Sequence, residues 1–178
     1  MASVFRETVQ ELFNPAEYLE DIFAINLDSL ENRGIKLLII DVNNTVLPQD
    51  ALQPSIRTMH WFEQLKEYSF QTILISSSLD KTRLSKIAAL LQVPVYYFVL
   101  KPFLPAVRHI LAKHAVTPEE CALVGDALVS DVLPAKLLGA YAILVKNCDQ
   151  PIIMEREISF LKRTRAAILE NIIHKKVN

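Results

Sequence analysis

The sequence predicts an α/β domain with a central parallel sheet, because short apolar segments alternate along it with amphipathic ones. The apolar segments are almost continuously hydrophobic, as in residues 35–40 (IKLLII), a pattern typical of parallel strands that are buried on both faces. The amphipathic segments carry apolar residues at helical spacing, as in residues 80–91. A chain of 178 residues fits one domain of ordinary size.

Capping residues and apolar faces predict the helices. Asn14, Pro15 and Glu17 have the residue types of an N-cap, a first helical position and a capping-box partner. Pro54 precedes the next helix, and Gly139 is the expected residue after the end of another. In chain order we expect helices at residues 14–24, 55–68, 80–91, 104–115, 130–138 and 155–176.

Apolar segments bounded by turn residues predict five strands between these helices. They lie at residues 35–40, 70–75, 95–99, 121–124 and 141–145. Because strands and helices alternate, consecutive strands are expected to be parallel and joined by helical crossovers. We therefore expect a single domain over residues 1–178, with a helical lead-in at 14–34, a core at 35–146 and a C-terminal amphipathic helix at 155–176.

The composition excludes several classes of protein. Hydrophobic residues make up 51% of the chain and charged residues 22%, which is typical of a globular protein. A net charge of -1 argues against a nucleic-acid partner, which would call for a basic excess. No apolar run reaches the ~18 residues of a membrane span, and residues 1–10 lack the apolar core of a signal peptide, so we expect a cytoplasmic protein.

Polar residues follow the ends of four predicted strands. Asp41, Ser76, Lys101 and Asp126 each stand at or just after such an end. In open α/β sheets, ligands bind at the edge where the carboxyl ends of the strands meet. The sequence therefore predicts that these four side chains gather at one site.

The same positions resemble the motifs of a known superfamily. Residues 41–45 (DVNNT), Ser76, residues 101–102 (KP) and residues 125–131 (GDALVSD) resemble, in order, the four motifs of haloacid dehalogenase (HAD) proteins. The closer match is to the YqeG-like HAD phosphatases of subfamily IIIA, over about residues 13–145. This resemblance implies a HAD-like Rossmannoid domain of three layers and a phosphatase that acts on phosphate monoesters.

The resemblance also implies the catalytic chemistry. Asp41 is the expected nucleophile, because a carboxylate can attack phosphorus and split the transfer into two steps through an aspartyl phosphate. Both reactants are anionic, so the site needs positive charge from Lys101 and from Mg²⁺. By resemblance, Mg²⁺ is held by the Asp41 carboxylate, the Asn43 backbone carbonyl and Asp126.

The remaining implied roles concern phosphate binding and orientation of the metal ligands. Ser76 and Ser77, together with Lys101, are expected to bind the phosphate. Asp131 is expected to orient the ligands of the metal; its alternative role is that of a negative charge at a helix N-terminus.

One position departs from the HAD pattern. The family carries a second aspartate two residues after the nucleophile, where it acts as general acid and base, but this chain has Asn43. An amide does not exchange protons near neutral pH, and general acid–base help is worth ~10²–10⁴-fold in rate. The alternative hypothesis is therefore a catalytically impaired relative that serves as a metal- and phosphate-binding interaction module.

The spacing of the motifs leaves no room for a cap domain. Residues 46–75 and 77–100 are each used up by one helix and one strand, with connecting loops. By analogy with capless relatives, the phosphate would be carried on a lipid headgroup, as in phosphatidylglycerophosphate, or on a macromolecule. Residues 156–178 contain six basic and two acidic side chains, so this helix either contacts an anionic membrane or packs on the domain with a solvated basic face.

Overall fold

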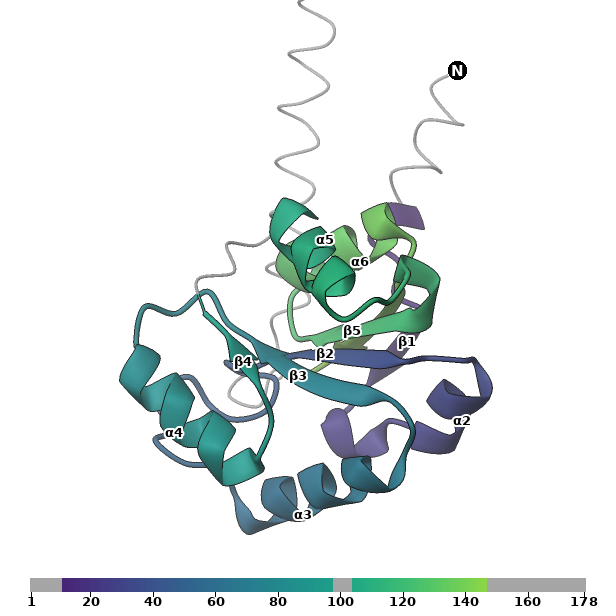
Figure 1. The fold of residues 1–178 in the computed structure, drawn as a ribbon. Helices are drawn as coiled ribbons and strands as arrows, with labels where there is room; N and C mark the ends of the chain where they lie inside the picture. Colours follow the sequence, from purple (N-terminus) through teal and green to yellow (C-terminus); the bar gives the residue numbers. More distant parts are fainter. Residues whose placement is uncertain (1–10, 98–103, 147–178) are drawn as a thin grey trace, which may run out of the picture.

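A computed structural model describes residues 11–97 and 104–146, which form a six-stranded sheet with helices against both faces (Figure 1). All strand pairs are parallel, in the order β1-β6-β5-β2-β3-β4. The strands are β1 (Glu17–Leu19), β2 (Leu37–Asp41), β3 (Gln71–Ile75), β4 (Val95–Tyr96), β5 (Cys121–Gly125) and β6 (Tyr141–Val145). The α/β fold predicted from the sequence is confirmed.

Most helices lie where the sequence predicts them. The α-helices are α2 (Leu27–Asn32), α3 (Ile56–Gln64), α4 (Lys81–Leu91), α5 (Leu104–Lys113) and α6 (Leu133–Leu138). Short helical turns are η1 (Ile22–Ala24), η2 (Leu65–Glu67), η3 (Pro118–Glu120) and the π-helical turn η4 (Leu128–Val132). Side-chain oxygens of Ser55 and Asp80 accept hydrogen bonds from backbone N–H groups in the first turns of α3 and α4, which fixes where these helices begin.

The core consists of two apolar layers, one on each face of the sheet. Leu38 and Ile40 of β2 pack in the layer that includes buried residues of α3 and α4, whereas Leu37 and Ile39 pack with α5 and α6. All four are essentially inaccessible to solvent. The continuous apolar pattern of this strand therefore reflects burial on both faces, as expected for the centre of a parallel sheet.

The order of the strands reverses beside β2. The chain continues from β2 to β3 and β4 on one side of the sheet, then returns to place β5 and β6 on the other side of β2. A crevice forms where connections leave a sheet in opposite directions, at the carboxyl ends of the strands. The topology thus predicts a ligand site at the end of β2, between the ends of its neighbours β3 and β5.

The helix expected at residues 14–24 is wrong, because part of this segment is a strand. Glu17–Leu19 pair with β6 at the outer edge of the sheet, and the Tyr141 hydroxyl donates to Oε1 of Glu17 (2.8 Å) from 124 positions away. This pairing satisfies backbone groups of β6 that would otherwise lie at a sheet edge. A local capping pattern carries no information about so distant a partner. The lead-in therefore contains β1, η1 and α2, and its helix begins after Asn26.

The described residues contain no cap domain. The chain between β2 and β3 forms a turn, α3 and η2, and α4 is the only helix between β3 and β4. Within residues 11–97 and 104–146, no helix has both the length and the apolar character to cross a bilayer. The end of the strand expected at 95–99 and the helix expected at 155–176 lie outside the described residues.

Candidate active site

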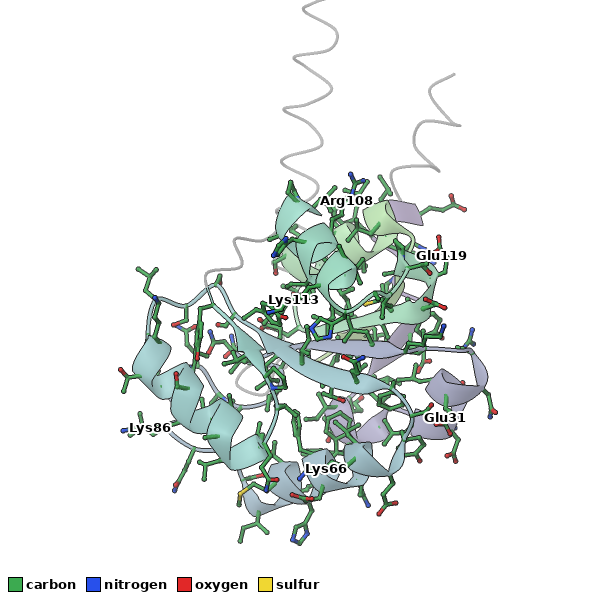
Figure 2. All side chains as sticks on the ribbon, viewed as in Figure 1. Glu31, Lys66, Lys86, Arg108, Lys113 and Glu119 are labelled. Atoms are coloured by element: carbon green, nitrogen blue, oxygen red, sulfur yellow. The ribbon has the colours of Figure 1, made fainter. Side chains whose placement is uncertain are left out.

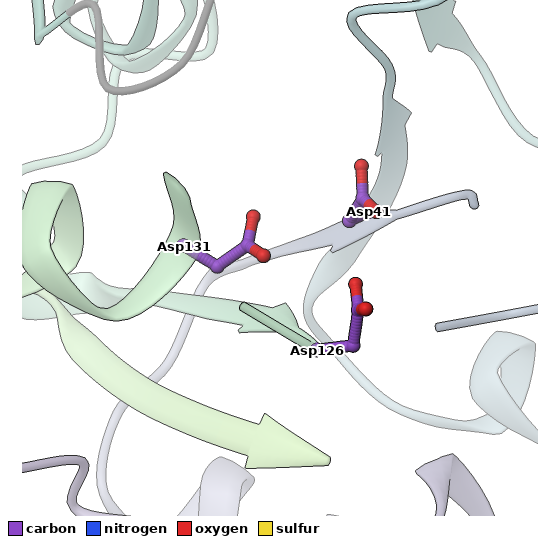
Figure 3. A group of neighbouring side chains, drawn as sticks. All are labelled: Asp41, Asp126 and Asp131. Atoms are coloured by element: carbon purple, nitrogen blue, oxygen red, sulfur yellow. The ribbon is translucent and has the colours of Figure 1, made fainter. Parts of the chain in front are cut away.

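Three carboxylates gather at the carboxyl edge of the sheet. Asp41 is the last residue of β2, Asp126 directly follows β5, and Asp131 lies in η4. Each offers an oxygen within 4.8 Å of the others, and Figure 3 shows the three side chains reaching into one space from separate elements. Asp41 and Asp131 are buried, and Asp126 is partly exposed. The predicted neighbourhood of Asp41 and Asp126 is therefore present.

Asp131 approaches the cluster because a glycine and an unusual helical turn make room for it. A Cβ atom on Gly125 would lie 2.1 Å from Cγ of Asp131, so only glycine fits at this strand end. Oδ2 of Asp131 accepts hydrogen bonds from the backbone N–H of Ala127 (3.0 Å) and the hydroxyl of Ser130 (3.3 Å). The wider π turn aims this side chain inward from the start of the helical segment, and such turns are frequent at functional sites.

A threonine of the first motif joins two of the strand ends. Oγ1 of Thr45 donates to Oδ1 of Asp126 (3.2 Å), and Thr45 is buried. A tight turn places it there: Val46 and Leu47 both donate their N–H groups to the Val42 carbonyl. Thr45 is a site residue that the motif pattern did not single out; its only sequence signal is its place four residues after Asp41, in a strand-end loop.

The amide of Asn43 faces the end of β3. Its Nδ2 donates to Oγ of Ser76 (3.3 Å), and the backbone N–H of Ser78 donates to the same oxygen (3.2 Å). Ser76 is fully buried, whereas Ser77 is exposed. Asn43 and Ser76 are thus in direct contact. Of the two serines expected to bind phosphate, only Ser77 is exposed to solvent.

A buried arginine outside the predicted motifs also reaches this loop. Arg83 of α4 is 8% exposed, and its Nη1 donates to Oδ1 of Asn43 (2.8 Å). Its only sequence signal was a charged residue on the face of α4 that carries Leu84 and Ile87, both buried. Lys101, expected to be the cation of the site, lies outside the described residues.

The three aspartates fit a divalent metal ion. Ionised carboxylates this close repel one another, and a cation between them removes that repulsion. All three offer oxygen ligands. Oxygen is the donor type that Mg²⁺ and Ca²⁺ prefer, whereas softer metals such as Zn²⁺ favour nitrogen and sulfur ligands. Among the described residues, Asp41, Asp126 and Asp131 are thus the side chains that could hold the metal.

Comparisons with known proteins identify the family. A family model described as mitochondrial PGP phosphatase matches residues 3–148. The chain belongs to this family. The chain is also similar to the probable phosphatase YqeG of Bacillus subtilis (strain 168), with 29% identity over 137 residues, covering 77% of this chain and 79% of that protein.

Solved structures agree with this family assignment at the level of the fold. The 3-deoxy-D-manno-octulosonate 8-phosphate phosphatase of Yersinia pestis aligns with a TM-score of 0.56 and 19% identity, over 73% of this chain and 74% of that one. The enzyme of the same name from Moraxella catarrhalis, solved with magnesium, phosphate and KDO, aligns with a TM-score of 0.50 and 14% identity, over 83% and 99%. At these identities the likeness shows a shared fold, and membership of a phosphatase family rests on the family model.

Proposed function

We propose that this phosphatase is Mg²⁺-dependent, that Asp41 is its nucleophile, and that its substrate is a phosphate monoester on a lipid headgroup of the phosphatidylglycerophosphate type. The observation that carries the proposal is the convergence of Asp41, Asp126 and Asp131 at the switch point of the sheet. In a family of phosphatases, a carboxylate at that edge beside a metal-binding set has the chemistry of an attacking group.

The residues of the chain divide the work of the first step. Asp41 Oδ attacks phosphorus, the bond from phosphorus to the ester oxygen breaks, and an aspartyl phosphate forms. Mg²⁺, held by Asp41, Asp126 and the Asn43 carbonyl, would offset the negative charge of the phosphate. We propose that Asp131 orients the metal ligands, since its carboxylate is itself held in place by the backbone N–H of Ala127. Lys101 and Ser77 remain the proposed phosphate contacts, with Ser76 supporting them.

The second step returns the free enzyme. Water attacks phosphorus, the bond to Asp41 breaks, and inorganic phosphate leaves. Both steps move protons, to the departing alkoxide and from the water, and Asn43 cannot serve either transfer. We therefore infer slow intrinsic chemistry, with the leaving-group proton supplied by solvent or by the substrate itself.

The open edge supports a substrate whose phosphate is attached to something large. No cap covers the site in the described chain, and the family description names a phosphatase of PGP. A phosphorylated sugar acid is the alternative, because structural relatives are KDO 8-phosphate phosphatases. We also propose that residues 155–176 provide peripheral contact with an anionic membrane on the cytoplasmic side.

The test combines turnover with binding. We expect Mg²⁺-dependent release of phosphate from phosphatidylglycerophosphate in mixed micelles, faster than from KDO 8-phosphate, and no release by Asp41→Asn. Beryllofluoride with Mg²⁺ mimics the aspartyl phosphate, so it should raise the melting temperature of the wild type but not of Asp41→Asn.

A matched pair of variants tests the metal site. By calorimetry, Asp126→Ala should lose Mg²⁺ binding, whereas the control Glu119→Ala should retain it. Glu119 lies in η3, at the far side of the domain from α4 (Figure 2). Equal Mg²⁺ affinity in the two variants would contradict the metal assignment. Mg²⁺ and beryllofluoride binding without hydrolysis of either ester would favour the interaction module.

A further inference from the structure

The guanidinium group of Arg83 is buried, and its hydrogen bonds all go to the loop after β2. Nε donates to the carbonyl of Ala51 (2.8 Å), Nη2 to the carbonyl of Pro48 (3.1 Å) and Nη1 to Oδ1 of Asn43 (2.8 Å). Arginine is seldom buried to this extent unless its donors are matched. The two carbonyl contacts hold the loop on α4, and the third reaches into the active site.

The contact with Asn43 fixes which way its amide points. A guanidinium group has five donors and no acceptor, so the atom of Asn43 that faces it must be the amide oxygen. The amide nitrogen then lies on the opposite branch, where it is 3.3 Å from Oγ of Ser76. The orientation therefore follows from the chemistry of arginine. One N–H of Nδ2 is donated to Ser76 at the end of β3, and the second N–H of the same nitrogen remains for a further acceptor.

The same direction of hydrogen-bond donation extends to Ser76. Its oxygen already accepts from Asn43 Nδ2 and from the backbone N–H of Ser78, which occupies both of its lone pairs. The hydroxyl hydrogen is then left to act as a donor. Arg83, Asn43 and Ser76 thus form a chain of hydrogen bonds with every hydrogen pointing away from Arg83.

We propose that Arg83 is a positioning residue that turns position 43 into a hydrogen-bond donor for the substrate phosphate. Phosphate oxygens of an ionised monoester have lone pairs and few or no hydrogens, so donors held in place complement them and strengthen as charge develops. This inference rests on the proposed function, and it gives Asn43 a role of its own at the position where the family has a proton-exchanging aspartate.

The enzymatic test is a double-mutant cycle between positions 83 and 43. In the wild-type background, Arg83→Met should lower kcat/KM for a phosphate monoester about tenfold or more, because the amide is free to flip. In an Asn43→Ala background the same change should lower it less than about threefold, because there is no amide to orient. Lys86→Met, on the outer face of the same helix (Figure 2), is the control and should change neither value.

Stability separates positioning from loop anchoring. Loss of the contacts to Pro48 and Ala51 should lower the melting temperature by a similar amount in both backgrounds. If kcat/KM also falls equally in both backgrounds, Arg83 is only a structural anchor and the proposal is wrong. Should Arg83→Met fail to fold, Arg83→Lys replaces it in the cycle, because an ammonium group retains the charge but cannot make the three directed contacts.

An NMR measurement tests the orientation of the Asn43 amide independently of the proposed function. The side-chain amide signals of Asn43, identified as the ¹H–¹⁵N pair missing from Asn43→Ala, should shift in Arg83→Met and stay in place in Lys86→Met. If no phosphate ester is hydrolysed, the proposed function fails, while this shift still tests the orientation of the amide. Unshifted Asn43 signals in Arg83→Met would overturn the inference.

Discussion

At the scale of single residues, Gly125 is required because Asp131 packs directly against its Cα. Its missing side chain leaves the space that Asp131 occupies, since an added Cβ would lie 2.1 Å from Cγ of that aspartate. Gly125→Ala should therefore push Asp131 out of the cluster and weaken Mg²⁺ binding at least tenfold by calorimetry. Gly34→Ala is the control for glycine loss: its φ of +78° will lower the stability, but no atom lies within 4 Å of the added Cβ, so Mg²⁺ affinity should be unchanged. Unchanged Mg²⁺ affinity in Gly125→Ala would mean that Asp131 does not support the metal.

Asn43 permits a second prediction at this scale. Asn43→Asp keeps the size of the side chain and the oxygen that accepts from Arg83, and it replaces the amide nitrogen by an oxygen able to exchange protons. The amide N–H that we propose for phosphate binding is lost, but general acid–base help is worth ~10²–10⁴-fold, so steady-state turnover should still rise, by up to ~10²-fold. Asp41→Asn should abolish turnover in both backgrounds. An unchanged rate in an active protein would show that another group already supplies the proton.

At the scale of elements, α6 ends as the sequence predicts. Gly139 has a φ of +86° and directs its N–H back to the Lys136 carbonyl (3.2 Å), which is the left-handed end typical of helices. Gly139→Ala should lower the free energy of unfolding by about 1 kcal/mol, whereas Gly139→Asn should lower it less, because asparagine tolerates this conformation. Denaturant titration measures both, and equal losses would contradict the conformational explanation.

The helix predicted at residues 14–24 was wrong because part of that segment depends on a distant partner. β1 forms because β6 offers an edge, more than 120 positions along the chain. The elements predicted well have their causes nearby, as in the Ser55 and Asp80 caps. Local pattern therefore predicts most helices and the central strands, while the edge strand β1 requires the assembled sheet.

At the scale of the whole molecule, the open edge of the sheet sets the expected substrate range. Because the described residues form no cap, a small ester gains little binding energy remote from the phosphate. Such remote binding energy is what accelerates turnover of larger substrates. We expect kcat/KM for p-nitrophenyl phosphate to be at least ~10²-fold below that for a lipid-borne phosphate. Brisk hydrolysis of small phosphorylated metabolites in a substrate panel would contradict a capless site specialised for large substrates.

Both the fold class and the meeting of Asp41 with Asp126 at one edge of the sheet were determined by the sequence itself. Apolar runs buried on both faces and helices with strong caps predict a parallel α/β sheet, and the strand ends then place Asp41 and Asp126 at one edge. Those signals are short-range, so they can be recognised without knowing how the chain folds back on itself.

Tertiary structure alone decided which further side chains contact the residues of the site. It brought Asp131 into the carboxylate cluster, joined Thr45 to Asp126, and placed Arg83 against Asn43 from 40 positions away. Each of these contacts joins segments that are packed by different helices or strands, and no local pattern specifies which side chain will fill the space between them. The order of strands, which decides those neighbours, is set by burial across the whole sheet.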